Sequence, residues 1–228
     1  MLPHEVLGAR FPEAIGGLVA GSTARGEATP SSDLDLIVLL AGPPAPMRST
    51  ADVQGQLVEF FVHTEQSLIE FIDRERRLRR SPLLHMCAHG LIISDHDKRL
   101  ARLQDLARER WSAGPAPPVD GELDDRRYRL TAMLDDLVAE TDPADRAAIA
   151  AAVFTDVADL ALISRGRWSG AGRWLTRRLR DADAALADGL VAGLSTAVHG
   201  DPRVLIRCGR AELDRLGGRL DSGYERRA

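Results

Sequence analysis

The sequence predicts an α+β fold, with a small mixed β-sheet and helices in the N-terminal half and a helical bundle in the C-terminal half. Three observations support this prediction. Short apolar runs typical of strands occur in the first half. Residues 112–118, SAGPAPP, then interrupt all regular patterning. Beyond them, alanine and leucine recur at helical spacing and strand signals are nearly absent.

The first half alternates strand and helix signals. Residues 4–10 suit a short helix that ends before Pro12, and a second helix is expected to begin after Thr64, a good N-cap residue. A third is expected over residues 98–111. The proline-rich residues 41–50 are expected to form a turn without strand or helix. Buried strands are predicted for residues 15–22, 33–40, 56–64 and 91–95.

The second half is expected to form a bundle, and the break before it predicts two domains, residues 1–113 and 119–228. Arginine and aspartate alternate with the apolar positions, as on the solvated faces of packed helices. Helical stretches are predicted near residues 121–140, 143–165, 170–198 and 201–217.

Composition excludes several classes of protein. A chain of 228 residues with 44% hydrophobic and 28% charged residues is globular rather than disordered or fibrous. The net charge of −4 argues against general nucleic-acid binding, which needs a basic surface. Cys87 and Cys208 are too few for a disulfide framework or a zinc site. We find no secretory pattern at the N-terminus and no run approaching roughly 18 apolar residues, so we expect a cytoplasmic protein without a membrane span.

Two aspartates lie at the head of the second predicted strand. Asp33 and Asp35 are two residues apart, so in a strand their side chains point to the same face. Two neighbouring carboxylates repel each other unless a cation lies between them or one holds a proton. Mg²⁺ prefers oxygen ligands and joins one or two carboxylates to substrate phosphates, so the pair predicts a magnesium site.

A turn of small residues precedes these aspartates. The backbone N–H groups at Gly21 and Ser22, with the Ser22 hydroxyl, can hold a phosphate group, and Arg25 can add a bidentate contact. The ATPase loop GxxxxGK[ST] is excluded, because Glu27 and Ala28 stand where lysine and serine or threonine are required. The dinucleotide motif GxGxxG is absent from this region.

Together the motifs GSTARG, residues 21–26, and SDLDL, residues 32–36, resemble the signature of the nucleotidyltransferase superfamily that includes DNA polymerase beta, especially its small bacterial members. The resemblance covers roughly residues 15–64. It implies a Mg²⁺-dependent enzyme that uses a nucleoside triphosphate, most often ATP. A hydroxyl of an acceptor then attacks the α-phosphorus and pyrophosphate leaves.

Members of this superfamily use a third carboxylate on a later strand, and the resemblance points to Glu59, the only charged residue of LVEFFV. In members resembling the streptomycin and spectinomycin adenylyltransferases, such a glutamate is the base that takes the acceptor's proton. In polymerase-like members the third carboxylate binds metal. The sequence leaves both roles open.

Similarity to kanamycin-type nucleotidyltransferases implies that the helical half supplies an acceptor pocket. Within residues 165–179, Trp168 and Trp174 lie among five arginines that suit either a cationic, aromatic wall or a core with a solvated face. His85 and His89 fit structural roles better than metal binding, and His63 fits a structural role better than proton transfer.

Three functions are compatible with these motifs. The favoured one is transfer of a nucleoside monophosphate to a small hydroxylated molecule, such as an aminoglycoside-like or lincosamide-like antibiotic. A polycationic acceptor of that kind requires an anionic pocket on the helical half. The alternatives are an antitoxin-like enzyme that adenylylates a partner protein and a nucleotide-binding scaffold without catalysis. The oligomeric state stays open.

Overall fold

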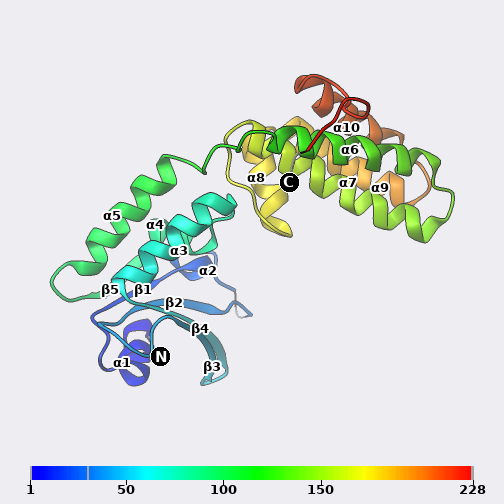
Figure 1. The fold of residues 1–228 in the computed structure, drawn as a ribbon. Helices are drawn as coiled ribbons and strands as arrows, with labels where there is room; N and C mark the ends of the chain where they lie inside the picture. The colour runs from blue at the N-terminus through cyan, green and yellow to red at the C-terminus, as the bar shows by residue number, and fades with distance from the viewer. Residues whose placement is uncertain (1, 30, 227–228) are drawn as a thin grey trace. The chain divides into compact units, whose positions relative to one another are not determined.

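The computed structural model describes residues 2–29 and 31–226, and its chain divides into two compact units, Met1–Gly114 and Pro115–Ala228 (Figure 1). The first unit contains a β-sheet with helices, and the described part of the second contains helices. The predicted α+β class is therefore confirmed. The boundary between the units falls within the proline- and glycine-rich residues 112–118.

The sheet of the first unit is five-stranded, in the order β3-β4-β2-β1-β5. β2 and β4 are parallel, whereas the other neighbouring pairs are antiparallel, so the sheet is mixed. The parallel pair brings the start of β2 beside β4 and thereby aligns two segments that carry carboxylates. The strands are β1 (Gly16–Val19), β2 (Leu34–Leu39), β3 (Met47–Val53), β4 (Gln56–His63) and β5 (Leu91–Asp95).

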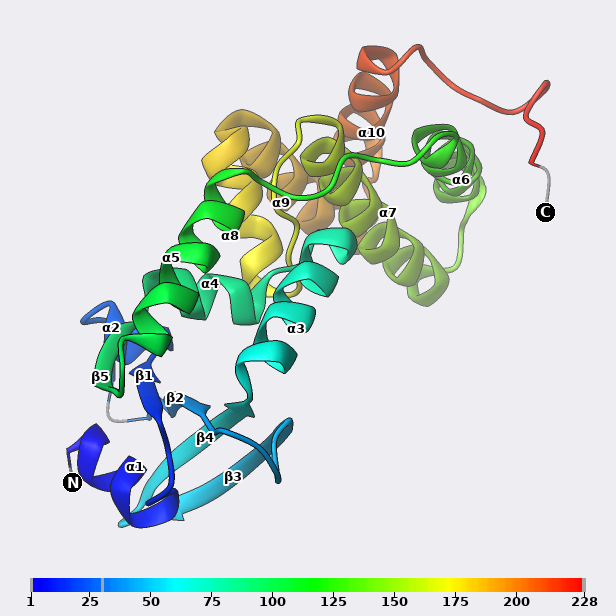
Figure 2. The ribbon, with the colours of Figure 1, turned by 60° about the vertical axis from the view of Figure 1, so that its left-hand side comes forward.

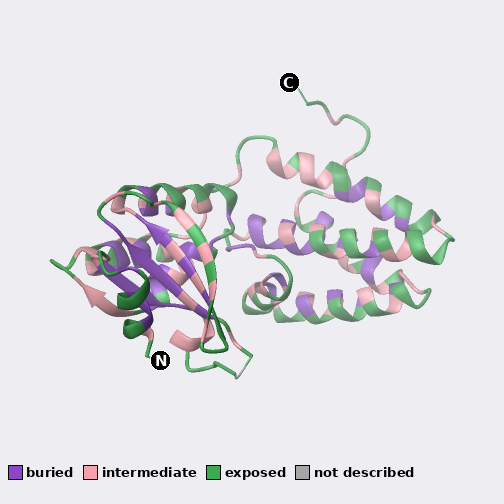
Figure 3. Ribbon diagram, turned by 90° about the horizontal axis from the view of Figure 1, so that it is seen from below, coloured by how far each residue is buried: buried purple, intermediate pink, exposed green. Residues whose placement is uncertain are grey.

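Helices cover both faces of this sheet (Figure 2). Helix α1 packs on one face with the apolar side chains of β2 and β4. Helices α3 and α5 pack on the other, and α4 packs against both of them. In Figure 3 the strands β1 and β2 are almost entirely buried. The helices are α1 (Pro3–Arg10), the one-turn α2 (Gly21–Ala24), α3 (Glu65–Leu78), α4 (Pro82–His89) and α5 (Arg99–Ser112).

Two adjacent glycines in β1 allow helices to approach both faces. A Cβ on Gly16 would lie 3.1 Å from Leu100 Cβ of α5, and one on Gly17 would overlap Leu7 of α1. Successive strand residues face opposite sides, so each glycine admits a different helix. The pair fixes β1 in the middle of the layers.

Residues 41–50 depart from prediction, because β3 begins at Met47 and is an edge strand. The prolines end at Pro46, and the strand after them alternates exposed and half-buried residues. β3 and β4 are joined by Gln54 and Gly55, both with positive φ, as a two-residue hairpin requires. The expectation of a turn without strand was therefore wrong for the second half of this segment.

Helix α4 was also not predicted. The α3 side chain Glu75 supplies its N-terminal cap and accepts the backbone N–H groups of Leu83 at 3.0 Å and Leu84 at 2.8 Å. Burial raises the pKa of Glu75, while these hydrogen bonds oppose that shift. The cap comes from another helix, so no local sequence pattern marks it.

The second unit contains the helices α6 (Glu122–Ala139), α7 (Pro143–Ser164), α8 (Arg173–Ala182), α9 (Ala184–Val198) and α10 (Arg203–Arg215). The single stretch predicted for residues 170–198 is divided at Asp183, whose carboxylate accepts the Leu186 N–H at 3.0 Å and caps α9. The shared core is formed by leucine, valine and alanine side chains of all five helices.

Helix α7 is long and apolar enough to cross a membrane by length and composition, with a mean hydropathy of 1.8 over its best window. The expectation that no apolar run is long enough to span a membrane was therefore wrong for this helix. Residues such as Val153, Val157 and Leu160 are buried against the other helices of the unit. A helix at the centre of a bundle is apolar on several faces because it buries several faces.

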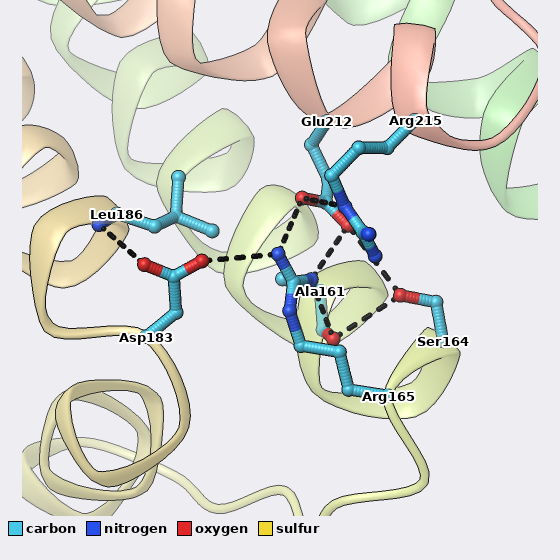
Figure 4. A network of polar contacts seen from close by, with 7 residues as sticks. All are labelled: Ala161, Ser164, Arg165, Asp183, Leu186, Glu212 and Arg215. Atoms are coloured by element: carbon cyan, nitrogen blue, oxygen red, sulfur yellow. Dashed lines mark hydrogen bonds and ion pairs between the residues drawn. The ribbon is translucent and has the colours of Figure 1, made fainter.

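A buried ionic network joins α7, α9 and α10 (Figure 4). Arg165, next to the C-terminal end of α7, donates to Glu212 of α10 at 2.8 Å and to Asp183 at 3.1 Å. Glu212 is only 2% exposed and also accepts from Ser164 and Arg215. The negative charge of Glu212 is thus balanced inside the bundle by Arg165 and Arg215.

Candidate active site

The turn after β1 is shaped by the backbone of Gly21. Its φ is +64°, a conformation that favours glycine, and a Cβ there would overlap the Asp35 carboxylate. The Ala20 N–H also donates to the Asp35 carbonyl at 2.9 Å. The turn of the first motif therefore lies directly against the aspartate of the second.

Strand pairing brings a second carboxylate to the same place. Asp35 in β2 is paired in parallel register with Glu59 in β4, so both side chains leave the same face of the sheet at neighbouring positions. Asp33 is exposed and directly precedes β2. Asp33, Asp35 and Glu59 thus lie close together near the N-terminal end of β2.

The electrostatics of Asp35 reflect this crowding. Burial, followed by the charges of Asp33 and Glu59, raises the pKa of Asp35 to about 6, while Arg48 and Arg25 partly oppose the shift. A carboxylate in this position is costly to ionise without a counter-charge. A hard divalent cation would supply one, so the donor set fits a magnesium ion held by Asp33 and Asp35.

Arg48 is the residue of this site that the sequence analysis missed. From the edge strand β3 its Nη2 donates to Glu59 Oε2 at 2.7 Å, and its guanidinium lies 4.9 Å from the Phe61 ring centre. Its side chain is 62% exposed, whereas that of Glu59 is 20% exposed. The sequence does not reveal this contact, because the prolines before Met47 indicate a turn rather than a strand beside β4.

The predicted phosphate-binding residues lie on the same turn. Ser22 is half-buried in α2, and its carbonyl accepts the Glu27 N–H at 2.9 Å, which closes the turn. Arg25 is exposed and donates through Nε to Glu27 at 2.9 Å. Arg25 is near enough to lower the pKa of Asp35, so its charge reaches the carboxylates.

Three histidines of this unit contact neighbouring side chains. His63 is buried, contacts Ser67 through Nδ1 at 3.3 Å, and has its pKa lowered to about 4 by burial, so it is neutral near pH 7. The rings of His85 and His89 pack on Trp111. Among residues 2–29 and 31–226, no group of three or more His, Cys, Asp or Glu side chains is arranged to hold a metal ion.

Residues 165–179 of the helical unit divide between two roles. Arg165 belongs to the internal network, and Trp168 is buried with 7% exposure, as the core interpretation predicts. Trp174 is half-buried, and Arg177 and Arg178 lie 5.3 and 5.8 Å from its ring centre. Part of the expected cationic, aromatic wall is thus core structure.

Comparison with protein families identifies the class to which this site belongs. Residues 9–85 match the family described as "Nucleotidyltransferase domain". This range contains Asp33, Asp35 and Glu59 and the turn that begins at Gly21. The chain therefore carries a nucleotidyltransferase domain and is an enzyme of the transferase class.

Among solved structures, the chain is similar to a nucleotidyltransferase-like protein from Exiguobacterium sibiricum 255-15. The two share 15% sequence identity with a TM-score of 0.45, over 93% of this chain and 73% of the other. No curated protein matches the chain.

Proposed function

We propose that this enzyme moves a nucleoside monophosphate from a nucleoside triphosphate, most readily ATP, to a hydroxyl group of a small molecule, and that it depends on Mg²⁺. The observation that carries the proposal is the close fit of Gly21 against Asp35. This contact supports the proposal, because a turn that binds phosphate beside a pair of carboxylates is the arrangement that nucleotidyl transfer requires.

Each residue has a distinct role in this proposal. Asp33 and Asp35 hold the metal, which neutralises charge on the triphosphate when bound. Ser22 and Arg25 bind phosphate oxygens and align the triphosphate with the acceptor. The acceptor oxygen forms a bond to the α-phosphorus, the bond to the pyrophosphate breaks, and the acceptor's proton passes to a base. This division of labour uses positioning and charge compensation rather than a covalent intermediate.

Glu59 keeps two possible roles. As the register partner of Asp35 it suits the role of a third metal ligand. As a partly exposed carboxylate paired with Arg48, it equally suits the role of the base that accepts the proton. The substitution Glu59→Gln separates these roles. Loss of transfer with unchanged Mg²⁺ and nucleotide affinity identifies the base, whereas loss of both identifies the metal ligand. Calorimetry and a pyrophosphate-release assay measure the two quantities.

The acceptor class rests on resemblance. Enzymes of the antibiotic-modifying type combine a similar first domain with a helical second one, so aminoglycoside-like and lincosamide-like molecules are the first acceptors to screen. An antitoxin-like adenylyltransferase would instead modify a partner protein, and a scaffold would bind nucleotide without turnover. We infer a cytoplasmic enzyme that acts on a soluble acceptor.

The first test is calorimetric titration of the intact chain with ATP, GTP, CTP and UTP, each with and without Mg²⁺. The proposal requires Mg²⁺-dependent binding of at least one triphosphate and its loss in Asp33→Ala. Circular dichroism checks that this exposed substitution leaves the fold intact. Absence of binding, or equal binding by the variant, would contradict the proposed site, whereas binding without pyrophosphate release for any acceptor would favour the scaffold.

A further inference from the structure

A groove in the helical unit offers a second site, separate from the carboxylates. It is about 590 Å³ in volume, within the usual range for small-molecule sites of roughly 300–1,000 Å³. Val138 of α6 lines one side, and α10 lines the rest. Its α10 lining includes Arg203, Ile206, Arg207, Arg210 and Asp214.

Helices α6 and α10 approach each other closely beside the groove. A Cβ on Gly209 would lie 2.8 Å from Leu134 Cδ2, so only glycine allows this approach without a shift. Val138 follows Leu134 by one helical turn and is 56% exposed, while Ile206 is buried. The groove therefore has an apolar floor that is partly open to solvent.

The side chains that line the groove carry more positive than negative charge, with three arginines and Asp214. Arg203 is already bound by Asp201, with contacts of 2.8 and 2.7 Å. Within the described ranges, the guanidinium groups of Arg207 and Arg210 form no hydrogen bond or ion pair, although Arg210 is near enough to lower the pKa of Asp135. Arg207 and Arg210 are three residues apart on α10, so they project from the same face.

We propose that this groove binds a small phosphomonoester with an apolar or carbohydrate body. A phosphate has enough oxygens to accept from two guanidinium forks, whereas one carboxylate is filled by a single fork. Val138 and Ile206 contact the body of the ligand, and Asp214, one turn beyond Arg210, accepts a hydrogen bond from a hydroxyl group. The groove has the opposite charge to the anionic pocket that a polycationic acceptor requires.

The site is independent of the proposed transfer reaction, and its test uses no nucleotide. The intact, ¹⁵N-labelled chain is titrated without Mg²⁺, at low ionic strength, with phenyl phosphate, inorganic phosphate and phenol in turn. We expect phenyl phosphate to shift the amide signals of α10 and of the C-terminal end of α6. Inorganic phosphate should bind more weakly at the same residues, and phenol should cause no comparable shift.

Paired variants decide whether the two arginines are responsible. Arg207→Gln/Arg210→Gln should weaken phenyl phosphate binding at least tenfold. The matched control Arg74→Gln/Arg77→Gln removes the same charge from two exposed arginines, also three residues apart but on α3, and should leave the affinity unchanged. Equal weakening in both variants would reduce the effect to general electrostatics and overturn the proposal. Shifts confined to other helices, or no binding at all, would overturn it as well.

Discussion

At the scale of single residues, Gly21 links the turn to the carboxylates. Two independent properties require glycine there, a positive φ and the lack of room for a Cβ beside Asp35. Gly26 shares the first property, with φ +71°, but a Cβ at that position would meet nothing within 4 Å. The two glycines therefore form a natural matched pair.

We predict that Gly21→Ala abolishes nucleotidyl transfer because the new methyl group displaces the Asp35 carboxylate. Gly26→Ala carries the same backbone strain, about 1–2 kcal/mol, and should keep its activity. Thermal unfolding measures the strain in both variants, and pyrophosphate release measures turnover. Comparable activity in the two variants would show that the contact with Asp35 is unimportant.

The raised pKa of Asp35 gives a pH prediction. Its ordinary pKa is 3.8 and the folded value is about 6, so the stability gained from its protonated form is present below about pH 4 and is lost as the pH rises through 6. Because this carboxyl is partly exposed, solvent screening keeps the loss below about 3 kcal/mol. Asp35→Asn should therefore be more stable than the parent at neutral pH without metal, and similar to it in acid.

Urea unfolding in the presence of a chelator, at about pH 4 and about pH 8, measures this difference. Adding Mg²⁺ should stabilise the parent chain and leave Asp35→Asn unchanged. If the difference in free energy of unfolding between Asp35→Asn and the parent is the same at both pH values, ionisation of Asp35 does not destabilise the folded chain.

At the scale of elements, strand pairing and ion pairs stabilise each unit internally. The edge strand β3 places Arg48 against Glu59, and the end of α7 places Arg165 against Glu212. The first pair is largely exposed on its arginine side, whereas the second lies among packed helices. The difference in burial predicts different energetic effects.

Arg165→Met should lower the free energy of unfolding by about 3 kcal/mol, because the buried Glu212 loses its closest arginine partner and keeps the weaker contacts with Ser164 and Arg215. The control Arg129→Met breaks the ion pair between Arg129, whose side chain is 56% exposed, and Asp156. It should lower the free energy of unfolding by at most about 1 kcal/mol. Chemical denaturation of both variants makes the comparison. Equal losses would refute the structural role of the network.

At the scale of the whole molecule, each unit has its own apolar core. The first is built around β2 and β4, and the second around α7. We predict that residues 115–228, expressed alone, form a helical domain that unfolds cooperatively on heating, as monitored by circular dichroism. A fragment without a cooperative transition would show that the helical unit depends on the first.

Much of the candidate site was predictable because it is local in sequence. Gly21, Ser22, Asp33 and Asp35 lie in two short motifs whose spacing already indicates a phosphate turn and a metal-binding pair. Arg48 was not predictable, because its partner Glu59 is reached only through the β3–β4 hairpin. The prolines before β3 concealed the strand, and the α4 cap was concealed because Glu75 belongs to another helix.

Periodicity, proline and short motifs act over a few residues, so the sequence predicts the α+β class, a break near residues 112–118 and Asp33, Asp35 and Glu59 as candidate carboxylates. Which side chains meet depends on the tertiary structure. The parallel pairing of β2 with β4 set Glu59 beside Asp35, and the crossing of α6 with α10 opened the arginine-lined groove. Such contacts join residues far apart in the chain, and their geometry depends on how whole strands and helices pack.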